Sequence, residues 1–168
     1  MEYNKNTYSL FITKPGFVNK QNLIEKILNK NNIVVVKKEE QQLLRSKVEL
    51  HYAEHEGKNF YTKLVNYMTN GVVEGLHKFD PTCVVMVVAS ANKNETEENF
   101  ITRSREVVKT QLRPALELNR RDFNLSDADF NELTKTANGI HASDSPASAK
   151  REIKNLCPSY NLNDDLSF

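Results

Sequence analysis

The sequence predicts a fold of the α+β or α/β class, in which a sheet of four strands packs against helices. Three apolar runs rich in β-branched residues are typical of strands, at residues 8–13, 33–36 and 82–90, and a shorter one follows at 139–142. Between these runs, apolar residues recur every three or four positions, as one face of a helix requires. The predicted order is therefore strand, helix, strand, helices, strand, helix, strand, helix.

Length and composition are those of an ordinary globular protein. The 168 residues fit one domain spanning residues 1–168, with a polar C-terminal tail from about residue 157 to 168. A net charge of +1 gives no electrostatic reason to expect a nucleic-acid or membrane partner. No segment has the apolar length of a membrane span or a signal peptide, and Cys83 and Cys157 lie far apart. We therefore expect a soluble, cytoplasmic protein with reduced cysteines.

The N-terminal part predicts a strand, a helix and a second strand. The apolar run at 8–13 ends at Lys14-Pro15-Gly16, a turn signal that leaves the lysine at the end of the strand. Apolar residues then recur at helical spacing through 23–28. The β-branched run at 33–36 favours a new strand over a longer helix.

Two helices are expected before the third strand. Residues 39–50 predict a helix with a polar outer face and an inward apolar face formed by Leu43, Leu44 and Val48. The polar stretch 51–58 predicts irregular structure. A second amphipathic helix covers 59–70 and ends at Asn70-Gly71, a good C-terminal stop.

The third predicted strand has a clear sequence pattern, whereas part of the chain after it does not. The nearly unbroken apolar run at 82–90 is typical of a central strand covered on both faces. Helical spacing returns at 96–112. Residues 113–135 give only a weak signal, which predicts a long loop with one helical turn near 127–133.

The most informative segment is residues 138–145, Asn-Gly-Ile-His-Ala-Ser-Asp-Ser, which includes the fourth predicted strand. It places His141 among amide and hydroxyl groups, just before Ser145-Pro146, a start signal for a last helix at 146–156. Imidazole is partly neutral at pH 7 and can act as a nucleophile without a separate strong base. A lone histidine at a strand end is more often an ordinary surface residue, so the surrounding pattern decides.

That pattern continues through Ala147-Ser148-Ala149 and Arg151-Glu152-Ile153, and the whole stretch resembles the catalytic histidine motif of the nucleoside diphosphate kinases. The resemblance implies that His141 carries a phosphoryl group from a nucleoside triphosphate to a nucleoside diphosphate by a ping-pong mechanism. Ser143 and Glu152 would orient its ring, although the glutamate alone would be an ordinary exposed residue. The family fold is α+β, ferredoxin-like βαββαβ, with helices packed on a four-stranded antiparallel sheet.

A second block, residues 51–61, is similar to the nucleotide-binding part of the same family. The resemblance implies that Tyr52 lies beside the catalytic histidine and the phosphates, and that His55 lies on the phosphate side. Phe60 would stack on the base, with Leu64 in the same block. Packing on the inner face of a helix is the alternative for Phe60 and Leu64, since residues four apart lie on the same face whether they bind a base or pack in the core.

Several basic and polar residues are candidates for binding phosphates. Lys14 resembles the family lysine that contacts the sugar hydroxyl and the phosphates, and Asn138 would position the same groups. Arg120, before Arg121-Asp122-Phe123, resembles the arginine of the family's Arg-Gly-Asp-Phe stretch. The planar guanidinium suits phosphate oxygens, although any single arginine can equally be a surface charge.

Arg105 and Thr110 resemble an earlier arginine and threonine pair, with Arg103 as the competing arginine. The chain departs from the family pattern around these residues. The family's glycine-rich loop is replaced by residues 109–119, and extra residues lie between Gly71 and Pro81 and between Arg120 and His141.

The resemblance implies nucleoside tri- and diphosphates as substrates, Mg²⁺ carried with their phosphates, no metal held by the protein itself, and a homo-oligomer. No Walker motif is present, so a P-loop mechanism is excluded. One alternative is a catalytically degenerate relative that binds nucleotides in a binding or regulatory role. Another is a nucleic-acid-binding module, because RNA-recognition domains share this strand order, but the near-neutral charge and the lack of an aromatic-rich strand argue against it.

Overall fold

The structure is a computed structural model of the chain, and it describes residues 2–160 and 162. Its main sheet has the strand order β2–β5–β1–β6, and every neighbouring pair is antiparallel. The strands are β1 (Ser9–Thr13), β2 (Ile33–Gln42), β5 (Thr82–Ser90) and β6 (Ile140–Ala142). This is the predicted ferredoxin-like order, with the first and third strands of the motif in the middle of the sheet. The polar tail predicted at 157–168 falls mostly outside the described residues.

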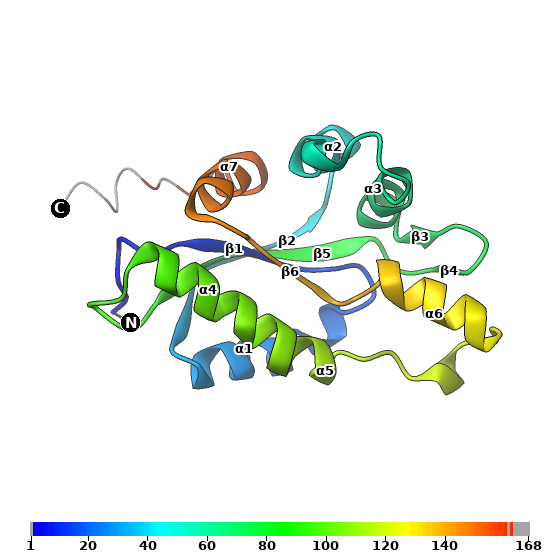
Figure 1. Cartoon of the computed structure of the whole chain (residues 1–168), viewed down its shortest axis with the longest axis horizontal. Helices are drawn as coiled ribbons and strands as arrows, with labels where there is room; N and C mark the ends of the chain where they lie inside the picture. Colours follow the sequence, from blue (N-terminus) through cyan, green and yellow to red (C-terminus); the bar gives the residue numbers. More distant parts are fainter. Residues whose placement is uncertain (1, 161, 163–168) are drawn as a thin grey trace.

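Helices cover both faces of the sheet (Figure 1). One face carries α1 (Gln21–Lys30), α4 (Glu97–Val107) and α5 (Arg113–Ala115), and the other carries α2 (Arg45–His51), α3 (Tyr61–Asn70) and α7 (Pro146–Leu156). In β5, residues 83–90 are all buried, as predicted for a central strand covered on both faces. Within the described chain, no helix has both the length and the apolar composition that crossing a bilayer requires.

The predicted helix at 39–50 is wrong in its first half. Strand β2 continues to Gln42 and pairs with β5 up to Thr82, with a bulge between Val35 and Lys37. The side chains of this part are polar because β2 is an edge strand, whose exposed face needs no apolar residue. Leu44 is 64% exposed, whereas Leu43 and Val48 are buried as expected.

The extra residues relative to the family pattern form structure of their own. Those between Gly71 and Pro81 form a hairpin of β3 (Val72–Val73) and β4 (His77–Lys78). Gly71 ends α3 with a φ of +75°, and a Cβ there would lie 2.2 Å from the carbonyl oxygen of Phe79.

Residues 113–135, predicted as a long loop, contain more helix than expected. Helix α6 (Asp127–Thr136) has ten residues, and Ser126 caps it by accepting a hydrogen bond from the amide of Asp129. Its Phe130 ring lies 5.8 Å from the ring of Phe123, which in turn lies 4.9 Å from His77 of the hairpin. The two extra segments therefore pack against each other, a long-range contact that a local pattern cannot show.

The predicted helix at 96–112 is interrupted near its C-terminal end. Thr96 caps α4, which ends at Val107, and a π-helical turn at Val108–Leu112 leads into α5. Pro114 has no N–H to donate to the carbonyl of Thr110, so the regular helical ladder cannot continue there. Turns of this kind are frequent at functional sites, and this one borders the pocket described below.

Candidate active site

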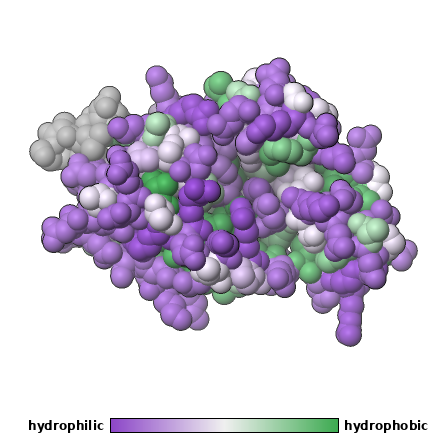
Figure 2. Space-filling view, viewed as in Figure 1, coloured by the Kyte–Doolittle hydropathy of each residue, from purple (hydrophilic) through white to green (hydrophobic). Residues whose placement is uncertain are grey.

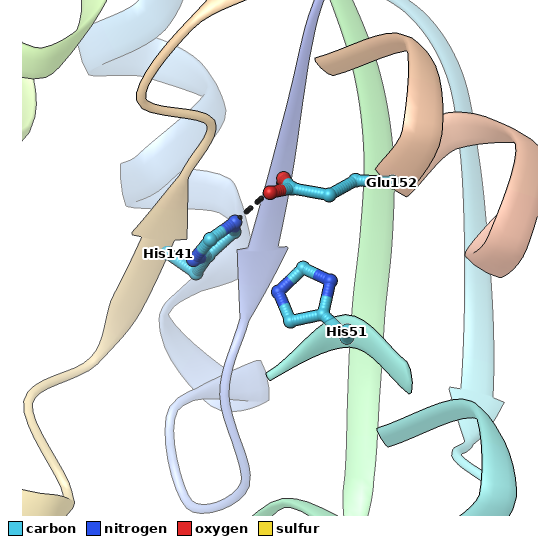
Figure 3. A group of neighbouring side chains, drawn as sticks. All are labelled: His51, His141 and Glu152. Atoms are coloured by element: carbon cyan, nitrogen blue, oxygen red, sulfur yellow. Dashed lines mark hydrogen bonds and ion pairs between the residues drawn. The ribbon is translucent and has the colours of Figure 1, made fainter. Parts of the chain in front are cut away.

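Strand β6 places His141 at the edge of the sheet, where its ring meets a carboxylate from α7. Nε2 of His141 lies 2.9 Å from Oε1 of Glu152 (Figure 3). The hydroxyl of Ser143 donates to the same carboxylate oxygen at 2.8 Å and accepts a hydrogen bond from the amide of Leu10 at 3.0 Å. Glu152 is only 5% exposed, so these contacts fix its direction. Nε2 is thus engaged, and Nδ1 has no hydrogen-bond partner among the described residues.

Two further aromatic side chains pack around this histidine. The ring of His51, the last residue of α2, lies 4.6 Å from that of His141, and the ring of Tyr52 lies 6.4 Å from it. Burial, and then the nearby charges of His141 and Arg151, hold the pKa of His51 well below its usual 6.5. The His51 ring is therefore neutral at pH 7. Burial also raises the pKa of the Tyr52 hydroxyl, which stays protonated.

Lys14 and Asn138, which are far apart in the sequence, are paired at the end of β1. Nζ of Lys14 donates to Oδ1 of Asn138 at 2.7 Å, and the backbone N–H of Lys14 donates to the carbonyl of Gly139 at 2.9 Å. Lys14 is 6% exposed, and burial, followed by the nearby charge of Arg113, lowers its pKa to about 8. The structure therefore holds a buried cation beside the start of β6, the strand that carries His141.

A pocket of about 380 Å³ lies between β6 and the helical segment 101–113. Four of its lining residues are basic, Lys14, Arg105, Lys109 and Arg113. We call it the basic pocket. His141 also lines it, as do two carboxylates, Glu106 and Asp144. In the part of the chain that the structure describes, none of the four basic residues forms an ion pair. Unpaired cations gathered around a cavity favour an anionic ligand.

Of the expected phosphate-binding residues, only Lys14 and Arg105 line this pocket; Asn138, Tyr52, His55, Arg120 and Thr110 do not. Arg120 instead lies over the ring of Phe130 of α6, at 5.6 Å from its centroid, and donates to the carbonyl of Phe123 at 3.1 Å. It also lies 3.3 Å from the exposed carboxylate of Asp127. The hydroxyl of Thr110 donates to the carbonyl of Glu106 at 2.7 Å, one turn back in its own helix. Helix α6, part of the extra segment, thus supplies the contacts that keep Arg120 away.

Arg103, the competitor of Arg105, has a structural position. Its guanidinium binds the carboxylate of Glu95 through Nε and Nη2, both at 2.9 Å, and donates to the carbonyl of Asn31. The hydrogen bonds from Arg103 are the largest cause that lowers the pKa of the Glu95 carboxyl. Arg103 thus ties α4 to the end of α1, and Arg105 is the arginine of the pair that faces the basic pocket.

The residues expected around the base follow one another away from His141. The ring of His55 lies 6.3 Å from that of Tyr52 and 5.3 Å from that of Phe60. Phe60 directly precedes α3 and is 47% exposed, so part of its ring is free to stack. Leu64 is partly buried and packs against the core, as in the alternative interpretation of this residue.

The prediction from the sequence missed Lys109 and Arg113 in the basic pocket, and His51 beside His141. The first two had a signal, because residues 105, 109 and 113 are all basic and recur every four positions. Residues four apart drift by about 40° around a regular α-helix. The wider π-helical turn at Val108–Leu112 reduces this drift, so that all three side chains line one pocket.

A family model described as nucleoside diphosphate kinase matches residues 7–161. A nucleoside diphosphate kinase of Methanocaldococcus jannaschii is 35% identical over 137 residues, which cover 79% of this chain and 77% of that protein. One from Psychromonas ingrahamii is 36% identical over 113 residues, covering 67% of this chain and 62% of that protein.

Two solved structures have a similar fold. The nucleoside diphosphate kinase of Aquifex aeolicus superimposes with a TM-score of 0.59 at 20% identity, covering 92% of this chain and 95% of that one. That of Encephalitozoon cuniculi gives a TM-score of 0.60 at 17% identity, covering 89% and 88% of the two chains. At such low identity these two structures support the fold alone.

Proposed function

This chain belongs to the nucleoside diphosphate kinase family, and on that premise we propose that His141 carries the phosphoryl group between the two nucleotides. The enzyme transfers the terminal phosphoryl group of a nucleoside triphosphate to a nucleoside diphosphate. The observation that carries the proposal is a histidine whose Nε2 is held by a buried carboxylate, at the wall of a pocket whose four basic residues form no ion pair with any described residue.

The proposed step is an attack by the ring nitrogen that Glu152 does not hold. The hydrogen bond to Glu152 keeps the proton on Nε2, so the lone pair of the neutral ring is on Nδ1. That lone pair forms a bond to the terminal phosphorus while the bond to the bridging oxygen breaks, and the nucleoside diphosphate leaves with the electron pair. The second nucleoside diphosphate reverses these events. As positive charge develops on the ring, Glu152 stabilises it.

The phosphate oxygens would be bound by the basic pocket. Lys14, Arg105, Lys109 and Arg113 would offset the charge of the polyphosphate, while Asn138 and Tyr52 would position the sugar and phosphates. Mg²⁺ is the usual divalent cation of this family. Four basic residues do not suit a metal held by the protein alone, so we propose that Mg²⁺ binds mainly to the nucleotide phosphates and offsets their charge.

Initial-rate kinetics test the two-step mechanism. With the triphosphate and the diphosphate varied in turn, a phosphoenzyme intermediate predicts parallel lines in double-reciprocal plots, because one product leaves before the second substrate binds. Intersecting lines would mean direct transfer between two bound nucleotides. That outcome would remove His141 from the chemistry and leave it a binding residue.

The exposed ring of Phe60 predicts tolerance of the base. Stacking contributes about 1–3 kcal/mol with every base, so rates with adenine, guanine and pyrimidine diphosphates should agree within about one order of magnitude. Phe60→Ala should raise KM for all of them by roughly tenfold, whereas Phe60→Tyr, which keeps a flat ring, should stay near the parent value. A preference of about 10⁴ for one base would instead require a buried hydrogen-bonding pocket, and would contradict the stacking role.

We also propose the assembly, the domain count and the compartment of this protein. We expect a homo-oligomer, as the family resemblance implies, and a single domain over residues 1–168. Both cysteines are free and buried, which fits the reducing cytoplasm.

A further inference from the structure

His51 is buried beside the catalytic histidine but is not satisfied there. It is 5% exposed, and neither of its ring nitrogens has a hydrogen-bond partner within the described residues. Buried polar groups are nearly always paired, so an unpaired imidazole calls for an explanation, one of which is a ligand that it binds. An imidazole nitrogen with a free lone pair is also among the commonest metal ligands in proteins.

Two further ligand atoms lie next to it. One nitrogen of His51, one of His141 and a carboxylate oxygen of Glu152 all lie within 4.8 Å of one another (Figure 3). The three residues come from α2, β6 and α7, and α2 and α7 lie on the same face of the sheet (Figure 1). Bonds of about 2.0–2.2 Å place the ligands of a tetrahedral ion about 3.4 Å apart, so shifts on the order of 1 Å complete such a site.

We propose that His51, His141 and Glu152 form an inhibitory binding site for a divalent transition-metal ion of the Zn²⁺ class. Two imidazoles and one carboxylate suit Zn²⁺, Co²⁺, Ni²⁺ or Cu²⁺, and leave a coordination position for water. Mg²⁺ prefers oxygen ligands, so the ion bound here differs from the one that accompanies the nucleotide. An ion can enter through the basic pocket, which His141 lines.

Binding of the ion would block the reaction, and this consequence rests on the proposed role of His141. An ion on Nδ1 occupies the attacking lone pair directly. An ion on Nε2 displaces the proton, which a neutral ring then carries on Nδ1. In either case Nδ1 has no lone pair for phosphorus. Conversely, a phosphoryl group on Nδ1 leaves the proton on Nε2 beside Glu152, so the phosphoenzyme should not bind the ion.

The site should be of moderate affinity and confined to the free enzyme. Arg151 places Nη2 3.8 Å from the second oxygen of Glu152, and the charge of Lys14 acts on His51. These positive charges oppose a divalent cation. A triphosphate in the basic pocket would also compete with the ion, because His141 lines that pocket.

Direct binding can be measured without turnover. Titration of the metal-free protein with Co²⁺ should give a 1:1 visible absorption band of tetrahedral type, which Zn²⁺ removes. His51→Asn removes a ligand and should weaken binding at least tenfold. Loss of a group that only supports a ligand already costs about 10- to 100-fold in metal affinity. The matched control is His55→Asn, which changes a histidine of the neighbouring turn that is 31% exposed and outside the cluster. No 1:1 band, or equal binding by His51→Asn, would overturn the site.

Inhibition is the second readout, with each variant compared to its own metal-free rate. With nucleotides well below KM and free Zn²⁺ at ten times its Kd, the parent enzyme should be slowed about tenfold, and a zinc-selective chelator should restore it. His55→Asn should show the same inhibition, and His51→Asn should need at least tenfold more Zn²⁺.

If His51→Asn does not fold, an experiment on the parent protein alone still tests the metal site. Protein first phosphorylated with ATP and freed of nucleotide should lose the Co²⁺ band, and it should regain the band after donating its phosphoryl group. A band of equal strength on the phosphoenzyme would refute the shared site. If no phosphoenzyme forms at all, the proposed function fails instead, while the Co²⁺ titration still decides the metal site.

Discussion

Incubation with Mg²⁺ and ATP labelled on its terminal phosphate should label this protein on histidine, and His141→Ala should abolish the label. The alanine side chain has no nucleophile, and a covalent mechanism cannot proceed without one. Turnover should fall by about 10⁴ or more, because the remaining binding residues support only residual catalysis. The measurement is the stability of the label, since phosphohistidine is lost in acid and kept in base, together with the rate of transfer to a nucleoside diphosphate.

Glu152→Gln is the matched variant for this experiment. The amide keeps the size of the side chain but removes the charge that stabilises the positive ring, so the label should still form, about 10–100 times more slowly. A melting curve checks that the hydrogen bonds to His141 and Ser143 have not been lost with the fold. A label that persists in His141→Ala, or that resists acid, would place the chemistry on another residue, with the buried Ser143, which binds the same Glu152 oxygen, as the first candidate.

Arg113→Ala should lower kcat by roughly 10², the effect expected when one charged donor is removed from a dry transition-state site. Arg105→Ala should have a similar effect. Both arginines line the basic pocket without a carboxylate partner in the described chain, so their charges are available to the migrating phosphoryl group. Steady-state kinetics with saturating nucleotide, at ionic strength held constant, give the comparison.

Two other arginines serve as controls. Arg120→Ala should change kcat less than about threefold, because Arg120 contacts Phe130 and the Phe123 carbonyl rather than the pocket. Arg103→Ala should lower the melting temperature through the lost contacts with Glu95, while kcat stays close to that of the parent. A 10² loss in Arg120→Ala together with full activity in Arg113→Ala would show that Arg120 swings into the site when the nucleotide binds.

The pH profile distinguishes these arginines in a second way. Lys14 has a pKa of about 8, and its charged form is the one that binds phosphate, so kcat/KM should fall as the pH rises through about 8. The charge of Arg113 contributes to lowering this pKa. Arg113→Ala should therefore move the alkaline limb to higher pH, and Arg120→Ala should leave it in place. An unmoved limb in Arg113→Ala would mean that its charge is not close to Lys14 in solution.

Segments whose ends are specified by a few neighbouring residues were predictable. The helix Pro146–Leu156 has the predicted bounds, and Ser145 accepts the amide hydrogen bond of Ser148 as its cap. The central strand Thr82–Ser90 also has its predicted bounds. Here the capping residues and the run of apolar side chains are all local, so the sequence contains the whole signal.

Segments defined by distant partners were not predictable. Residues 39–42 are strand because they pair with β5, although their polar side chains favoured a helix. Helix α6 and the β3–β4 hairpin pack through Phe123, Phe130 and His77, which come from separate parts of the chain. In both cases the stabilising contacts form only after the chain has folded.

By itself, the sequence determined the family and, through it, the sheet order, and it also singled out the residues that we propose for the chemistry, His141, Glu152 and Lys14. These residues lie in short motifs that can be identified without knowing how the rest of the chain folds. Only the tertiary structure decided which cations surround the pocket and which side chain packs against the histidine. Arg120 is held by α6, Lys109 and Arg113 are turned inward by the π-helical turn, and His51 meets His141 across two elements. Each of these outcomes depends on where a side chain points, and that direction is set by packing between elements rather than by position along the chain.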